Sequence, residues 1–177
     1  KLSNKPSIII TTSKIPKYPK TYYTRGINTK FSNIKLFLNK NIDSIKHCNK
    51  VDYILATNEI SKKYPEIILC NEKDYIIEGT SCNIFFIKKN KIFTPNINGY
   101  GVEGVMKNII INILKRNGIS TKTLNIKKTD VRNYDAAFFC NSIRKIWNIR
   151  SIGNTRYQNN DLVDQIKILI DENVWQI

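Results

Sequence analysis

Glu78-Gly79-Thr80-Ser81-Cys82-Asn83-Ile84-Phe85 opens the most informative segment of this 177-residue chain. The segment continues through Ile92-Phe93-Thr94 and ends in Val102-Glu103-Gly104-Val105-Met106-Lys107. A carboxylate at the end of an apolar strand is thus followed by a second strand, a turn and a glycine that opens a helix. The first amides of a helix have no partners within that helix. The order therefore predicts one cleft that holds an acidic side chain and a set of helix-start amides.

Residues 78–107 resemble the class IV pyridoxal-phosphate (PLP) aminotransferase pattern. That pattern has a Glu, an Asn five residues later with an aliphatic and an aromatic residue after it, an aliphatic-x-Thr step, and an aliphatic-x-Gly-aliphatic-x-basic ending. Every fixed position is matched in this chain. The resemblance implies an α/β (α+β) fold, the C-terminal domain of a fold-type-IV PLP enzyme, with a mixed sheet or pseudobarrel flanked by helices.

A second motif surrounds Lys46. From the residues alone, a lysine between an apolar run and a helix is placed to be partly desolvated, which lowers the pKa of an ammonium; an ordinary solvated lysine remains the alternative. Ile45-Lys46-His47-Cys48-Asn49-Lys50 resembles the lysine motif of the aminodeoxychorismate lyases within class IV, where Lys-His-x-Asn and a basic residue are typical. The resemblance implies that Lys46 is the catalytic residue and carries PLP covalently.

The resemblance also assigns the rest of the cofactor site. Glu78 is expected to contact the pyridine nitrogen, where a carboxylate keeps the ring protonated and able to accept electrons. Gly104 opens the helix whose Val105 and Met106 amides are expected to bind the phosphate, and Val102 is expected to pack on the ring. The predicted cofactor-binding residues are Lys46, Glu78, Val102, Gly104, Val105, Met106 and Ser142.

Other residues have supporting roles in this interpretation. Asn83 is expected to fix the turn after Glu78, and Thr80 and Ser81 to touch the ring or ordered water. His47 is expected to orient or pack near Lys46, because the lysine amine already supplies a base. Arg144-Lys145 and Trp147-Asn148 depart from the family pattern, either altering substrate contacts or changing only the surface.

Composition bounds the remaining classes of function. The net charge of +15 admits a polyanion partner, but the lysines are scattered among Asn and Ile, as biased composition alone would give. No apolar run reaches the ~20 residues of a membrane span. Four cysteines without a C-x-x-C pair, and a single histidine, argue against zinc and for free thiols in a reducing cytoplasm.

Hydrophobic patterns predict one main domain. We expect residues 1–14 to end a preceding N-terminal domain, with a buried strand at 7–12, residues 15–26 to form a linker, and 27–177 to form the PLP-binding domain. Residues 27–37 are expected to be extended, ending in the polar turn Asn39-Lys40-Asn41, and residues 49–63 to form a helix. Further strands are predicted at 67–70, 75–78, 84–88, 92–94, 121–125, 136–140 and 145–150, and helices at 105–117 and 161–172, with a hairpin turn at 88–91 and a helical turn from Thr129 or Asp130.

The resemblance implies a lyase that converts 4-amino-4-deoxychorismate to 4-aminobenzoate and pyruvate in folate biosynthesis, acting as a cytoplasmic homodimer on a small-molecule substrate, with no nucleic acid, membrane or metal. The nearest alternative is a branched-chain or D-amino-acid aminotransferase of the same fold. The spacing from Lys46 to Asn49 favours the lyase, because branched-chain enzymes usually place the Asn one residue later. A nucleic-acid-binding domain and a cofactor-free relic of the fold are two more distant possibilities.

Overall fold

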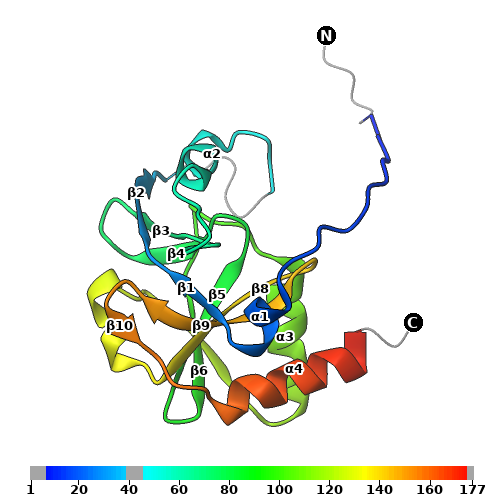
Figure 1. The fold of residues 1–177 in the computed structure, drawn as a ribbon, viewed down its shortest axis with the longest axis vertical. Coiled ribbons are helices and arrows are strands. Elements are labelled where there is room, and N and C mark those ends of the chain that lie inside the picture. The colour runs from blue at the N-terminus through cyan, green and yellow to red at the C-terminus, as the bar shows by residue number, and fades with distance from the viewer. Residues whose placement is uncertain (1–6, 39–45, 175–177) are drawn as a thin grey trace.

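The computed structural model describes residues 7–38 and 46–174. Two sheets form its frame (Figure 1). The elements are α1 Lys20–Thr24, β1 Ile27–Thr29, β2 Phe31–Leu36, α2 Val51–Thr57, β3 Ile68–Asn71, β4 Ile76–Gly79, β5 Asn83–Lys88, β6 Lys91–Pro95, α3 Val105–Arg116, β7 Thr121–Leu124, the 3₁₀ helix η2 Lys128–Asn133, β8 Ala136–Asn141, β9 Lys145–Ile152, β10 Thr155–Arg156 and α4 Asp161–Val174.

The larger sheet has the strand order β1-β9-β8-β5-β6-β7, with β10 paired to β9. Its centre is antiparallel, and both β1–β9 and β6–β7 are parallel. The smaller sheet has the order β2-β3-β4 and also mixes parallel and antiparallel pairs. The mixed α/β architecture predicted from the sequence is therefore confirmed.

Alternation along the central strands divides the core between two faces of the larger sheet. Ile84 and Phe86 of β5 face the small sheet, where they join Ile68 and Ile76 in one cluster. Phe85 and Ile87 face the other way, into a cluster formed with α3 and α4. Successive side chains of a strand point to opposite faces, so a strand buried on both sides is apolar throughout, as β5 is from Ile84 to Ile87.

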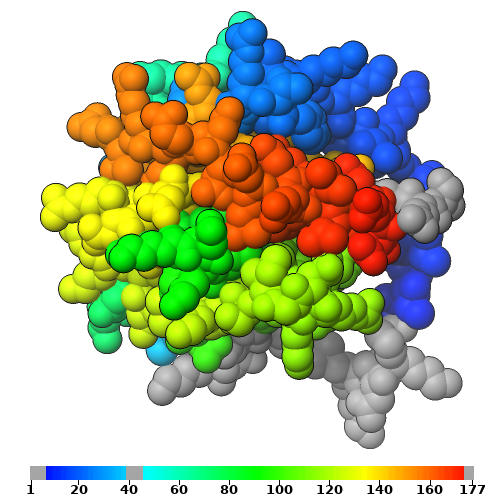
Figure 2. Space-filling model, turned by 90° about the horizontal axis from the view of Figure 1, so that it is seen from below, coloured from blue at the N-terminus to red at the C-terminus, as the bar shows by residue number. Residues whose placement is uncertain are grey.

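Helices close the outer faces of the two sheets. Figure 2 shows α4 and α3 side by side on one face of the molecule. On the far side, Ala56 of α2 packs with Leu36, Leu69 and Ile77 of the small sheet. None of the helices in the described ranges is long and apolar enough to cross a membrane.

Most of the elements predicted from sequence are confirmed. The hairpin between β5 and β6 turns at Lys89 and Asn90, which have φ of 49° and 56° as a two-residue type I′ turn requires. Gly118 ends α3 with φ of 73°. The four cysteines are free thiols, as predicted.

One predicted buried strand is wrong, and one predicted helix is shorter than expected. Residues 7–12 form no strand and are exposed, because no other strand of the described chain pairs with them. The helix predicted at 49–63 shortens to α2, and its apolar residues Val51, Ile54 and Leu55 are exposed. The polar turn predicted at Asn39-Lys40-Asn41 lies outside the described residues.

The segment predicted as a linker contains packed structure. Its helix α1 carries Tyr22 and Tyr23, which with the preceding Tyr18 surround the indole of Trp147 edge-on at ring-centroid distances of 5.2, 6.1 and 5.0 Å respectively. Trp147 therefore fixes part of this segment on the main domain.

Candidate active site

Glu78 lies near the end of β4 and is almost completely buried, with 4% of its surface exposed. Its carboxylate accepts hydrogen bonds from the Tyr53 hydroxyl, from Asn83 Nδ2 at 3.0 Å and from the Val102 amide at 3.2 Å. No cation within the described ranges forms an ion pair with it. A buried carboxylate with several neutral donors is suited to a positively charged partner from outside the chain.

The environment of Glu78 changes its acidity. Burial raises the pKa of Glu78 to about 7, because desolvation disfavours the charged form. The hydrogen bonds from Tyr53 and Val102 and the charges of Lys50 and Lys107 lower this pKa and so oppose the effect of burial. A carboxylate whose pKa lies near neutral pH is a candidate for a functional residue.

Asn83 connects Glu78 to the start of α3. Its Nδ2 also donates to the Val102 carbonyl at 2.9 Å, which holds residue 102 beside the acid. Gly104, the N-cap of α3, lies so close that a Cβ built on it would be 2.0 Å from Asn83 Oδ1. The structure therefore brings Glu78, Val102 and Gly104 together. The Asn83 side chain binds Glu78 and the segment before α3, rather than the turn after Glu78 that it was predicted to fix.

The N-terminus of α3 presents the amides predicted to bind phosphate. No side chain caps it, so the Val105 and Met106 amides keep their hydrogen-bonding capacity. Val105 is exposed, whereas Met106 is buried in the core beneath the helix. Lys107, in the same turn, is buried and pairs with Glu103 at 2.9 Å.

Lys46 lies in the irregular segment before α2 and is exposed, so of the two environments that the residues alone left open, the structure shows the solvated one. It lies close enough to Lys50 to affect it: burial lowers the pKa of Lys50, Glu78 opposes this, and the charge of Lys46 adds to the lowering. Lys50 therefore lies close enough to both Lys46 and Glu78 to be affected by their charges.

A cavity of about 260 Å³ lies beside this segment, lined by Leu36, Phe37, Leu38, His47, Asn49, Lys50, Val51, Asp52, Tyr53, Gly99 and Tyr100. His47 is half-buried, and its Nδ1 is buried without a hydrogen-bond partner in the described chain. The cavity therefore joins the lysine motif to Tyr53, which contacts Glu78.

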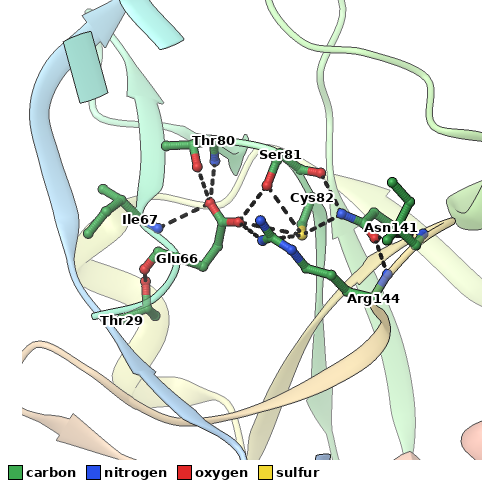
Figure 3. Close-up of polar contacts among 9 residues, drawn as sticks. Thr29, Glu66, Ile67, Thr80, Ser81, Cys82, Asn141 and Arg144 are labelled. Carbon is green, nitrogen blue, oxygen red and sulfur yellow. Dashed lines mark hydrogen bonds and ion pairs between the residues drawn. The ribbon is translucent and has the colours of Figure 1, made fainter. Parts of the chain in front are cut away.

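A second buried acid organises the turn that follows Glu78. Glu66 has no exposed surface, and its carboxylate accepts from the Thr80 amide at 2.7 Å, the Thr80 hydroxyl and the Ser81 hydroxyl at 2.8 Å (Figure 3). The same carboxylate also accepts from the Ile67 amide at 3.2 Å and forms an ion pair with Arg144. Thr80 and Ser81 are thus hydrogen-bond donors to Glu66 in this structure.

Asn141 connects the same turn to the segment that carries Ser142. Its Nδ2 donates to the Ser81 carbonyl at 3.0 Å, and its Oδ1 accepts from the amides of Ile143 and Arg144 at 3.0 and 2.6 Å (Figure 3). Ser142 is exposed at this turn. Its hydroxyl is therefore presented to solvent from a well-fixed loop.

Tyr53 and Glu66 are the site residues that sequence reasoning missed. Tyr53 is the third residue of α2, and nothing in the helical pattern of apolar residues indicates that its hydroxyl reaches Glu78. Glu66 follows Pro65 and precedes the apolar β3, and an acid beside a buried strand was the available signal. Arg144, left open from sequence, contacts Glu66 and stacks at 4.7 and 5.0 Å from the Trp147 and Tyr18 rings.

Comparison with known proteins finds relatives of two enzyme classes. The chain is 27% identical over 139 residues to an aminodeoxychorismate lyase of Vibrio harveyi, a match covering 78% of this chain and 51% of that protein. It is 31% identical over 100 residues to a probable branched-chain-amino-acid aminotransferase of Rickettsia bellii, covering 55% of this chain and 34% of that protein. The chain spans about half the length, or less, of the curated relatives it matches.

Solved structures show the same fold. The 4-amino-4-deoxychorismate lyase of Pseudomonas aeruginosa superposes with a TM-score of 0.88 at 20% identity, covering 93% of this chain and 61% of that one. The branched-chain aminotransferase of Thermobaculum terrenum, solved in its PLP form, gives 0.75 at 22% identity, covering 83% and 50%. The sequence profile described as Amino-transferase class IV matches residues 1–152. The chain therefore belongs to the class IV aminotransferase family.

Proposed function

We propose that this chain is the PLP-binding part of an aminodeoxychorismate lyase, which converts 4-amino-4-deoxychorismate to 4-aminobenzoate and pyruvate for folate synthesis. The observation that carries the proposal is Glu78, a buried carboxylate that receives three neutral donors and no ion pair from the described chain. Two of the similar proteins, the Vibrio harveyi relative and the Pseudomonas aeruginosa structure, are named as lyases of this type, which supports the proposal.

The residues present fit PLP. A protonated pyridine nitrogen requires a buried acceptor, and Glu78 meets that requirement. A phosphate requires unpaired amides, and the uncapped N-terminus of α3 after Gly104 provides them. His47 Nδ1, buried beside the cavity without a partner in the described part of the chain, is a further unsatisfied group facing that region.

PLP, when bound, supplies an electron sink for the carbon that loses its proton. Glu78 holds a proton at the ring nitrogen, which strengthens that sink. Lys46 Nζ would hold the cofactor covalently, and the freed amine would act as the base that removes the substrate ring proton. The same amine returns a proton to the departing enolpyruvate, and formation of an aromatic ring favours the products.

A branched-chain aminotransferase is the second candidate, because several curated relatives carry that function in their names. The two reactions differ in products. With full-length protein, the lyase releases pyruvate and 4-aminobenzoate from aminodeoxychorismate and does not transfer an amino group to 2-oxoglutarate. Amino transfer from branched-chain amino acids without pyruvate release would replace the proposed reaction by the aminotransferase reaction.

The proposed enzyme is a homodimer located in the cytoplasm, a reducing compartment in which its free thiols persist. Residues 1–14 belong to a preceding domain in this proposal, and residues 27–177 carry the cofactor. A nucleic-acid-binding function based on the +15 charge would instead give binding that falls steeply with salt and ignores PLP.

A further inference from the structure

Tyr53 is the residue through which α2 contacts the buried acid. Its hydroxyl donates to Glu78 Oε1 and lies 3.4 Å from the Tyr100 carbonyl. The Lys50 ammonium sits over the Tyr53 ring, 3.8 Å from its centroid. The ring is therefore held from one side by a cation and at its tip by a carboxylate.

This contact matters because α2 buries little of its own surface. Its apolar residues Val51, Ile54 and Leu55 are exposed, and Ala56 is its buried residue. The Thr57 hydroxyl donates only to the Ile54 carbonyl of the same helix, whereas the Tyr53 hydroxyl reaches β4. The link from Tyr53 to Glu78 therefore adds a polar contact at the start of α2, beside the packing of Ala56 on the small sheet and the ion pair of Glu59, just after α2, with Lys30.

We propose that Tyr53 is a positioning residue of the cofactor site: its hydroxyl fixes the orientation of the Glu78 carboxylate, favours its ionised form, and joins it to the segment that carries Lys46. The proposal deepens the proposed function and rests on it for the role of Glu78. It concerns a contact between two side chains of this chain, so it can be measured without the cofactor.

The chemistry of the contact follows from its surroundings. A hydrogen bond donated to the charged form of an acid favours that form. Burial and the neighbouring Glu78 raise the pKa of Tyr53, so its hydroxyl remains a donor throughout the physiological range. The charged groups that act on Glu78 are Lys50, before α2, and Lys107, on α3, and the Val102 amide and Asn83 are its other donors. Only Tyr53 among these comes from α2 itself.

The first experiment titrates Glu78 in the full-length apoprotein, using carboxyl ¹³C NMR with assignment by Glu78→Gln. Tyr53→Phe is expected to raise the pKa of Glu78 by about one unit or more, a tenfold change in its ionisation constant. Tyr64→Phe is the matched control, since Tyr64 also has a lysine over its ring, with Lys63 Nζ at 5.1 Å, but does not contact Glu78. It should leave the titration unchanged.

The outcome that overturns the proposal is a folded Tyr53→Phe protein whose Glu78 titrates as in wild type. Should Tyr53→Phe not fold, difluorotyrosine at position 53 replaces it. This residue keeps the ring and is a stronger donor, so it is expected to lower the pKa of Glu78, and an unchanged pKa would again overturn the proposal.

The second experiment separates this inference from the proposed function. Tyr53→Phe is expected to weaken PLP binding several-fold in otherwise wild-type protein and to have no further effect in a Glu78→Gln background. An equal loss in both backgrounds would contradict a role exercised through Glu78. If wild-type protein does not bind PLP, the proposed function fails, and the titration alone decides whether Tyr53 controls Glu78.

Discussion

The guanidinium of Arg144 forms an ion pair with the fully buried carboxylate of Glu66, 78 positions earlier in the chain. Through these two side chains the start of β3, the turn after Glu78 and the turn before β9 are fixed to one another (Figure 3). The two loops that flank the candidate site therefore share one support.

Removing Arg144 leaves a buried charge without its cation, which costs roughly 3–5 kcal/mol of unfolding free energy in proteins. We expect Arg144→Gln to destabilise full-length protein by about that amount in urea titrations. Lys167→Gln is the control, because Lys167 pairs at 3.1 Å with Asp164, whose side chain is 57% exposed, and such pairs contribute below about 1 kcal/mol. Similar small losses for both variants would show that the Glu66 pair does not support the fold.

The buried Glu78 predicts how the stability of the apoprotein depends on pH. The folded pKa is about 7 and the ordinary value is 4.5, so between these values the folded protein holds a proton that the unfolded chain has lost. The stabilising contribution is complete below pH 4.5 and is lost as pH rises toward 7. The size of the effect is on the order of 3 kcal/mol.

The test is the difference in unfolding free energy between wild type and Glu78→Gln, followed from pH 4.5 to 7.5. Taking this difference cancels the contributions of other carboxylates to the pH dependence of stability. Asp74 and Glu59, for example, have pKa values lowered by hydrogen bonds and nearby lysines, so their contributions fall as the pH falls. A difference that stays constant with pH would mean that Glu78 is ionised throughout.

Gly104 is required by a close approach. The Cβ of Gly104→Ala would be 2.0 Å from Asn83 Oδ1, so Asn83 must turn away and release both Glu78 and the Val102 carbonyl. We expect PLP affinity to fall by about tenfold or more, since a hydrogen bond to a charged group contributes ~1.5–3 kcal/mol. Binding is measured from the absorbance change on adding PLP to full-length protein.

Gly118→Ala is the control at the other end of α3. Gly118 has φ of 73° with nothing within 4 Å of an added Cβ, so the substitution strains the backbone without a clash. It should cost roughly 1 kcal/mol of stability and leave PLP affinity unchanged. Equal losses of affinity in both variants would indicate that α3 stability, rather than Asn83, controls binding.

Local sequence patterns predict much of this fold. The two positive-φ residues Lys89 and Asn90 lie between apolar runs, and the sequence predicts that hairpin directly. Glu78, Asn83 and Gly104 were identified through a family pattern within 30 residues, and the structure brings them together. These contacts lie within one short stretch, so few chain arrangements compete with the observed one.

Contacts between distant segments were not predictable in this way. A Glu beside a Pro is usually solvent-exposed, and Glu66 is buried only because Thr80, Ser81 and Arg144 supply its donors. The exposed face of α2 shows the converse, because its apolar residues recur at helical spacing and no element of the described chain covers them. The pattern of apolar residues predicts that a helix or strand forms, and the neighbouring elements determine which of its faces is buried.

In the proposed enzyme, Lys46 carries the cofactor opposite Glu78. Full-length protein loaded with PLP is reduced with borohydride, digested and mapped by mass spectrometry. We predict one phosphopyridoxyl label, on the peptide that contains Lys46, and its loss in Lys46→Ala. A label on another lysine in wild type, or no label at all, would show that Lys46 does not hold the cofactor.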